Sequence, residues 1–134
     1  MAQKKILVID DDLFWHRLLR RLFGDTDYDV HTAASCEDGV RMAEKHKPDC
    51  ILLDFHLKDG DAVDVCAALK HGAERPKFPV IVVSSDPEVE ITAYAECRAD
   101  YFVLKGSRTM TILPKVVSEV LGDRGRTVSW EAGH

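Results

Sequence analysis

The stretch ILVIDDDLFWHRLL, residues 6–19, runs four aliphatic residues directly into three aspartates and then into a second apolar segment. A short unbroken aliphatic run is typical of a strand covered on both faces, as in a parallel sheet. The apolar residues after the aspartates recur with helical spacing. Because adjacent carboxylates repel one another, gathering them at a strand end requires something that offsets the repulsion. The stretch therefore predicts a β-α unit with an acidic cluster where its strand ends.

Four further apolar runs follow the same scheme. Each is followed by a segment with helical spacing, and the runs are DVHTA (29–33), CILLD (50–54), VIVVS (80–84) and YFVLK (101–105). Strands and helices that alternate in this way form right-handed crossover units, which place helices on both faces of a parallel sheet. The sequence therefore predicts a doubly wound α/β fold with a five-stranded parallel sheet, (βα)5.

Residue types that begin and end helices mark several boundaries. Asp86 is expected to cap the fourth helix, with Pro87 as its first residue. Thr111 is expected to cap the fifth helix, which puts Pro114 in the first turn, where a missing N–H costs nothing. Gly122 is then expected just past the end of that helix.

The composition indicates one globular domain. The chain has 134 residues, of which 46% are hydrophobic and 31% are charged. Its apolar runs are much shorter than the ~20 residues that cross a bilayer, and its N-terminus does not resemble a signal peptide. Four cysteines without CxxC or CxxxC spacing fit reduced thiols in a cytoplasmic protein. The net charge is −5, and Arg17, Arg20 and Arg21 fit a solvated helix face better than a nucleic-acid patch. Neither nucleic acid nor membrane is expected as a partner.

The strand ends bring a defined set of chemical groups together. In a doubly wound fold, the functional crevice lies at the carboxyl ends of the strands. There the first strand ends in residues 10–12, the third in Asp54, the fourth in Ser84 and the fifth in Lys105. One of the first three aspartates is expected to cap the first helix. Clustered carboxylates bind Mg²⁺, a lysine pairs with a phosphoryl group, and an aspartate can be the nucleophile. The set predicts Mg²⁺-assisted phosphoryl transfer onto a carboxylate.

The pattern ILVIDDD … PDCILLDFHLKDGDAVDV … FPVIVVSSD … ADYFVLKG resembles the receiver domain of bacterial two-component response regulators. The resemblance extends from residue 4 to about residue 121. It implies a flavodoxin-like sheet with strand order 2-1-3-4-5, a receiver domain over residues 1–122 and a flexible tail over residues 123–134. It also implies a cytoplasmic phosphoprotein that signals, rather than an enzyme, although the domain assists its own phosphorylation and dephosphorylation.

The resemblance also implies a metal site and a phosphoacceptor. Asp54 matches the residue that receives the phosphoryl group from a phosphohistidine partner. Asp11 matches a direct ligand of Mg²⁺ or Mn²⁺, and Asp10 matches the acid that acts mainly through water. Asp54 and the backbone carbonyl of His56 complete the protein's share of the coordination.

Further residues match the family's switch and rate-setting positions. Ser84 and Lys105 match the hydroxyl and the lysine that bind the phosphoryl group, and Phe102 matches the switch aromatic. His56 and Asp86 lie at variable positions that modulate the dephosphorylation rate in the family. We expect His56 to orient or shield the attacking water.

The chain departs from the family pattern in two places. Lys58 and Ala62 stand where the family usually has proline and glycine, although Gly60 is available for the turn. A different loop path with the same chemistry is expected. Lys105 precedes Gly106 where the family commonly has a Lys-Pro cis bond, and a cis bond without proline costs ~3 kcal/mol. The sequence leaves the conformation of this bond open.

The resemblance implies protein partners. A histidine kinase or a histidine phosphotransfer protein is expected to dock beside the acidic site, where Phe14 or Trp15 stays partly exposed. The face formed by the fourth helix, the fifth strand and the fifth helix, roughly residues 87–121, is expected to bind a downstream target or an output domain. The same face could form a homodimer.

Three other functions fit parts of the same pattern. A haloacid-dehalogenase-type phosphatase would use Asp10 as nucleophile and Asp12 as acid/base, but it leaves Asp54 unexplained and needs a further acidic strand end. A flavin-binding protein of the same architecture would need a phosphate loop after the first strand. A pseudo-receiver that is never phosphorylated would not need the complete set of acids, hydroxyl and lysine.

Overall fold

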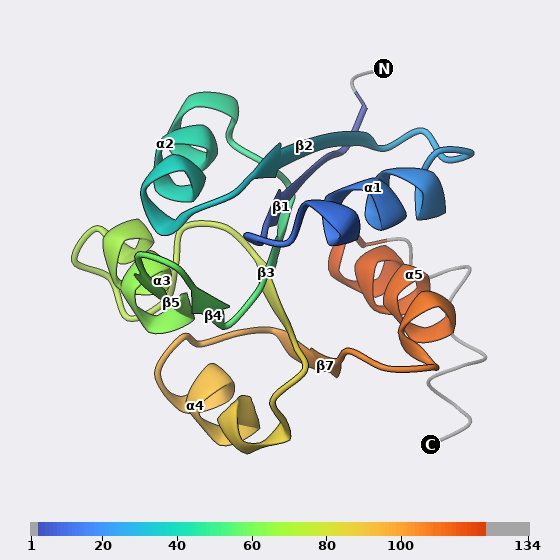
Figure 1. Ribbon diagram of the computed structural model, residues 1–134. Coiled ribbons are helices and arrows are strands. Elements are labelled where there is room, and N and C mark those ends of the chain that lie inside the picture. The colour runs from blue at the N-terminus through green and yellow to red at the C-terminus, as the bar shows by residue number, and fades with distance from the viewer. Residues whose placement is uncertain (1–2, 123–134) are drawn as a thin grey trace.

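Five parallel strands form the central sheet, in the spatial order β2-β1-β3-β6-β7 (Figure 1). The strands are β1 (Lys5–Ile9), β2 (Asp29–Ala33), β3 (Cys50–Leu53), β6 (Val80–Ser84) and β7 (Tyr101–Leu104). The structure is a computed structural model and describes residues 3–122. Without the short hairpin β4–β5, which lies outside this sheet, the order is 2-1-3-4-5. The predicted doubly wound, flavodoxin-like α/β fold is confirmed.

Helices cover both faces of the sheet. They are α1 (Leu13–Leu22), α2 (Cys36–His46), α3 (Ala62–Lys70), α4 (Glu90–Ala95) and α5 (Thr109–Val120), with a 3₁₀ turn η1 (Pro87–Val89) before α4. Figure 1 shows α1 and α5 on one face and α2, α3 and α4 on the other. This arrangement leaves the carboxyl ends of the strands open at one edge of the sheet.

The aliphatic run of β1 is buried on both faces, as its composition predicts. Ile6 and Val8 pack in the core beneath α1 and α5. Leu7 and Ile9 pack in the core beneath α2, α3 and α4. All four side chains are at most 2% exposed. Two packed faces fix the position of β1, and so fix where the aspartates that follow it lie.

Gly39 lets α2 pack closely on the sheet. A Cβ atom built there would lie 2.7 Å from Cδ1 and 2.8 Å from Cγ2 of Ile9. We expect Gly39→Ala to lower the free energy of unfolding by about 1–2 kcal/mol, because an overpacking cost near the upper end of about 1–3 kcal/mol outweighs the ~1 kcal/mol gain in helix propensity. Urea unfolding measures the loss. Gly106→Ala, where a Cβ meets nothing within 4 Å, is the control. Ile9→Val removes the Cδ1 atom and should recover part of the loss; equal stability of Gly39→Ala and wild type would contradict this account.

A short hairpin follows the third strand. Its strands are β4 (His56–Leu57) and β5 (Gly60–Asp61), so Lys58 lies in the turn. Asp59 accepts backbone N–H bonds from Cys36 at 2.8 Å and from Glu37 at 3.1 Å. These bonds tie the turn of the hairpin to the first residues of α2 and lower the pKa of Asp59. The region that the sequence describes only as a loop is therefore a fixed structure.

The predicted start of α5 is wrong. The helix begins at Thr109, so Thr111 is not its cap and Pro114 is the sixth helical residue. The reason is the Thr109 hydroxyl, which accepts an N–H from Gly106 at 2.7 Å and donates to the carbonyl of Leu104 at 2.9 Å. These two bonds turn the chain into the helix earlier than the proline suggests.

Of the other predicted boundaries, the end of α5 is confirmed. Asp86 and Pro87 begin the 3₁₀ turn η1, whereas α4 itself begins at Glu90. The Asp86 carboxylate accepts the Glu88 N–H at 2.9 Å and caps the turn that Pro87 begins. Gly122 follows α5 with a φ of +87°, a conformation that glycine adopts without a steric penalty.

Candidate functional site

The side chains at the strand ends lie at one edge of the sheet. Asp10 and Asp11 follow β1, Asp54 follows β3, Ser84 ends β6 and Lys105 follows β7. Asp54 is placed by its backbone N–H, which donates to the carbonyl of Ile9 at 2.9 Å. The chain thus brings together groups that are up to 95 residues apart in sequence.

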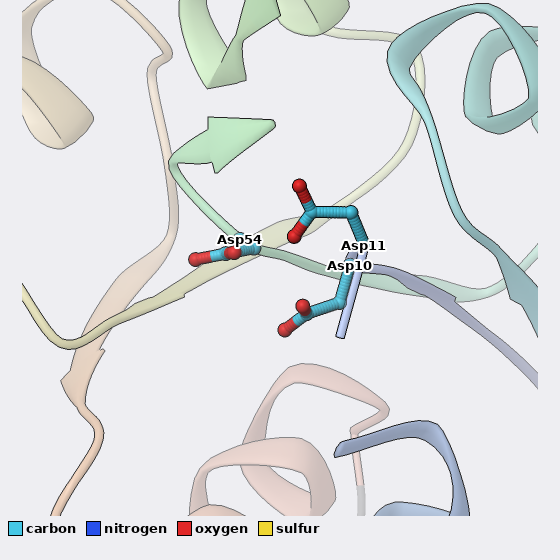
Figure 2. A group of neighbouring side chains, drawn as sticks. All are labelled: Asp10, Asp11 and Asp54. Atoms are coloured by element: carbon cyan, nitrogen blue, oxygen red, sulfur yellow. The ribbon is translucent and has the colours of Figure 1, made fainter. Parts of the chain in front are cut away.

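Three carboxylates form an acidic cluster. One oxygen each from Asp10, Asp11 and Asp54 lies within 4.8 Å of the other two. Figure 2 shows the three side chains pointing to the same side of the strand ends. Asp10 is buried, and the other two are half-buried. Several close, hard oxygen donors that are partly open to water are what Mg²⁺ prefers, so the donor set fits this ion.

Lys105 supplies the opposing charge. Its Nζ lies 2.8 Å from Oδ2 of Asp10 and 3.7 Å from Oδ1 of Asp54. Its backbone N–H donates to the carbonyl of Ser84 at 2.8 Å, which fixes the residue at the end of β7. The bond between Lys105 and Gly106 is trans. The lysine therefore reaches the acids without the cis bond that the family commonly uses.

Trp15 contacts the same lysine. The Nζ of Lys105 lies 4.8 Å from the centroid of the indole ring, a cation–π distance. The sequence suggests Trp15 only as a docking residue, because nothing in the pattern of α1 reveals which group its ring faces. The ring shields one side of the ammonium group from water.

Burial shapes the acidity of Asp54. Loss of solvation raises its pKa from 3.8 to about 6, and the Asp10 carboxylate adds to the rise. Lys105 and the backbone N–H of Phe55 oppose it. A cation in the cluster would favour the ionised form. The carboxylate of Asp54 is thus most costly to keep charged when no cation is near it.

Comparison with known proteins gives the same family. The response regulator receiver domain model matches residues 6–117. The chain belongs to the response regulator receiver domain family. A curated relative of this receiver domain is the alkaline phosphatase synthesis transcriptional regulatory protein PhoP of Bacillus subtilis, 35% identical over 103 residues. The match covers 76% of this chain and 42% of PhoP, so the chain spans less than half the length of that relative.

Solved structures share the fold of this receiver domain. A signal receiver domain from Vibrio parahaemolyticus has a TM-score of 0.80 at 21% identity, with 99% of this chain and 100% of that chain covered. The receiver domain of the sensor histidine kinase PA1611 from Pseudomonas aeruginosa has a TM-score of 0.74 at 19% identity, with 90% and 99% covered. That structure has a magnesium ion coordinated in its active-site cleft. The family acts in two-component signalling, where receiver domains interact with histidine kinases and output domains.

The three consecutive aspartates of the receiver domain, Asp10, Asp11 and Asp12, have different roles. Asp12 caps α1, accepting the Phe14 N–H at 3.0 Å, as expected for one of the three. The backbone N–H of Asp12 donates to Oδ1 of Asp10 at 2.9 Å. The carboxylate of Asp12 is therefore used to cap α1, while those of Asp10 and Asp11 lie at the crevice. This placement does not suit Asp12 for the acid/base role that a phosphatase would need.

Ser84 and Phe102 lie on neighbouring strands. Ser84 is 1% exposed, and its Oγ accepts the Asp86 N–H at 3.1 Å. Phe102 is half-buried against the core beneath α2, α3 and α4, and its backbone N–H donates to the Tyr94 hydroxyl at 2.9 Å. A pocket of about 420 Å³ lies beside Phe102, lined also by Leu104 and Ile112. Phe102 thus borders a cavity at the end of β7.

His56 and Asp86 pair across two loops. The Nε2 of His56 lies 3.0 Å from Oδ2 of Asp86. The bond to His56 and the Glu88 N–H lower the pKa of the Asp86 carboxyl. The pair joins the hairpin after Asp54 to the turn after Ser84.

Apolar side chains are exposed at the start of α1 and on the α4–β7–α5 face. Leu13 is 63% and Phe14 is 61% exposed, whereas Trp15 is half-buried. On the other face the exposed apolar residues are Ile91, Tyr94 and Leu104. Within residues 3–122, no helix is long and apolar enough to cross a membrane.

Proposed function

We propose that Asp54 is the phosphoacceptor of this receiver domain and that phosphorylation requires a divalent ion, Mg²⁺ or Mn²⁺. The observation that carries the proposal is the acidic cluster with Lys105 reaching both Asp10 and Asp54. Asp10, Asp11, Asp54 and the backbone carbonyl of His56 would hold the ion. The bound ion would neutralise charge on the phosphoryl oxygens.

The residues then divide the reaction among them. A carboxylate oxygen of Asp54 attacks the phosphorus of a phosphohistidine, the new O–P bond forms, and the P–N bond breaks with its electron pair on the imidazole. Lys105 pairs with a phosphoryl oxygen, and the Ser84 hydroxyl donates to another. Positioning and charge neutralisation supply most of the rate, because phosphoryl transfer needs little covalent help from the protein.

The product shifts a conformational equilibrium. Ser84 and Lys105 move toward the phosphoryl group, and Phe102 turns inward into the space that Ser84 leaves. The inactive and active conformations both exist before phosphorylation. The phosphoryl group shifts the equilibrium toward the active one, because it makes stronger contacts there. The α4–β7–α5 face, with its exposed Ile91 and Tyr94, then binds a downstream target or a second copy of the domain.

Phosphorylation by a small donor tests the proposal. With acetyl phosphate and Mg²⁺ the chain should gain one acid-stable, base-labile phosphoryl group, and mapping should place it on Asp54. Chelation of the metal should prevent it, and Asp10→Asn should slow it without moving the label. A label on Asp10 would indicate a phosphatase, and no label under any condition would indicate a pseudo-receiver.

The paired His56 and Asp86 set the phosphoryl lifetime in this proposal. The imidazole, held at the mouth of the site by Asp86, orients or shields the attacking water. His56→Ala should change the decay rate of phosphorylated Asp54 while the rate of phosphorylation stays near that of wild type. Equal lifetimes in the variant and wild type would remove this role.

The exposed start of α1 is proposed as the docking site for a histidine kinase or a histidine phosphotransfer protein. Phe14→Ala should slow transfer from such a partner and leave transfer from acetyl phosphate unchanged. Trp15 is a poor choice for this test, because its ring also contacts Lys105. Equal rates from both donors in Phe14→Ala would contradict the docking role.

Residues 1–122 constitute the receiver domain in this proposal, and the predicted tail, residues 123–134, lies outside the described residues. A cytoplasmic location is supported by four free, buried cysteines among the described residues.

A further inference from the structure

We infer that His16, on α1, is a positioning residue for the metal site, acting through the peptide that joins Asp10 to Asp11. The inference rests on the proposed function, because it concerns the ion that Asp10 and Asp11 would hold. His16 is not itself a metal ligand. It fixes the orientation of the ligands Asp10 and Asp11.

The contact that carries the inference is a buried hydrogen bond. The Nε2 of His16 lies 2.5 Å from the backbone carbonyl oxygen of Asp10. A carbonyl oxygen only accepts, so Nε2 carries the proton. His16 is 8% exposed and Asp10 is 1% exposed, so water competes little for this bond. The face of α1 around His16 is otherwise apolar, so the Asp10 carbonyl is the partner that satisfies its Nε2–H.

The position of His16 on α1 explains how it reaches the strand end. Asp12 caps the helix, so His16 is the fourth helical residue. Side chains on a helix lean toward its N-terminus, which directs this ring back past the cap to the end of β1. The helix itself is held by Leu19 and Phe23, both packed in the core. The donor therefore stands on a rigid element.

Holding the carbonyl of Asp10 also orients Asp11. The peptide is planar, so the carbonyl of Asp10 and the N–H of Asp11 move as one unit. Fixing that plane fixes the Cα atom of Asp11 and the direction in which its side chain leaves the chain. The repulsion between the carboxylates of Asp10, Asp11 and Asp54 works to splay this segment when no ion is bound.

Asp10 is held at every hydrogen-bonding atom. Its N–H donates to the carbonyl of Ala33 at 3.0 Å, Oδ1 accepts from the Asp12 N–H, and Oδ2 accepts from Lys105. His16 completes the set at the carbonyl. The Ala33, Asp12 and Lys105 bonds hold the N–H and the side chain. Among residues 3–122, the His16 bond is the only one to the carbonyl of the peptide that leads to Asp11.

Mg²⁺ affinity in His16 variants tests the inference. His16→Leu removes the donor, and we expect Mg²⁺ binding by calorimetry to weaken about 10-fold to 100-fold, the range typical of groups that orient metal ligands. His16→Gln keeps an N–H donor at similar reach and should restore most of the affinity. His46→Leu, at a half-buried histidine on α2, is the control and should bind Mg²⁺ like wild type.

A second measurement needs no substitution. In wild type, the ¹⁵N shifts of the His16 ring should show a proton on Nε2 that exchanges slowly with water. An Nδ1-protonated ring, or His16→Leu with wild-type Mg²⁺ affinity, would overturn the inference and leave the proposed function standing. Loss of stability in both variants with unchanged Mg²⁺ affinity would mark a purely structural role and overturn it too. Wild type that binds no Mg²⁺ would instead sink the proposed function.

Discussion

Asp54→Asn is expected to take up no phosphate from any donor and, without metal, to be more stable than wild type near neutral pH. The first effect follows because the amide is not a nucleophile for this reaction. The second follows from the raised pKa of Asp54, about 6 against an ordinary 3.8. Keeping this carboxylate ionised in the folded protein costs up to about 3 kcal/mol, since one pKa unit corresponds to about 1.4 kcal/mol.

The pH dependence has a definite sign. Below the unfolded pKa of 3.8 both states of wild type hold the proton, so Asp54 contributes no difference. As pH rises to about 6, the unfolded state releases its proton first, and the free energy of unfolding of wild type falls. The stability advantage of Asp54→Asn should therefore be absent near pH 3.5, grow through this window and level off above about pH 7.

Urea unfolding at several pH values in the presence of a chelator measures this difference. Saturating Mg²⁺ should stabilise wild type more than Asp54→Asn, because binding to the folded state alone adds stability. Asp100→Asn is a control at an exposed acid that lies outside the cluster. An Asp54→Asn advantage that is the same at pH 3.5 and pH 8 would show that the gain comes from packing rather than from charge.

Lys105→Met is expected to destabilise the metal-free protein and to slow phosphorylation strongly. The Asp10 carboxylate, on a side chain that is 2% exposed, would lose the cation that lies 2.8 Å from it. Removing one partner of a buried ion pair typically costs about 3–5 kcal/mol. Because 18% of the lysine side chain is exposed, we expect a smaller loss of about 2 kcal/mol. The pKa of Asp54 should rise further, since Lys105 lowers it in wild type.

A double-mutant cycle isolates the pair. In Asp10→Asn the lysine has less charge to neutralise, so adding Lys105→Met should cost less there than in wild type. Lys58→Met, at an exposed lysine in the hairpin turn, is the matched control and should stay within about 0.5 kcal/mol of wild type. If the effects of the two substitutions on the free energy of unfolding are additive, the ion pair between Asp10 and Lys105 contributes nothing to stability.

The sequence predicts the strands and the converging groups well because both depend on local pattern and on topology. Aliphatic runs such as residues 6–9 identify buried strands, and a parallel sheet forces their carboxyl ends to one edge. The start of α5 differs from the prediction because Pro114 is a strong local signal, whereas the two hydrogen bonds of Thr109 leave no signal in the sequence. Those bonds involve Leu104 and Gly106, whose positions follow from the tertiary structure.

Contacts between side chains of different elements could not be read from the sequence. The stacking of Trp15 on Lys105 depends on how α1 is rotated about its axis over the sheet. The bond from His16 to Asp10 depends on the same rotation. The hairpin after Asp54 could not be predicted from the sequence for another reason. Its strands have two residues each, too few for any periodicity to appear.

The anchorage of that hairpin has a thermodynamic consequence. Asp59 ties its turn to α2, so the backbone carrying the His56 carbonyl is ordered before any ligand arrives. Ordering a mobile segment on binding costs free energy for each residue that is fixed. Here that entropy is already lost during folding, so an ion bound at the proposed site would find the His56 carbonyl already ordered. In Asp59→Ala the hairpin should therefore be less ordered after folding, and part of the entropy loss of ordering it should fall on metal binding and weaken it.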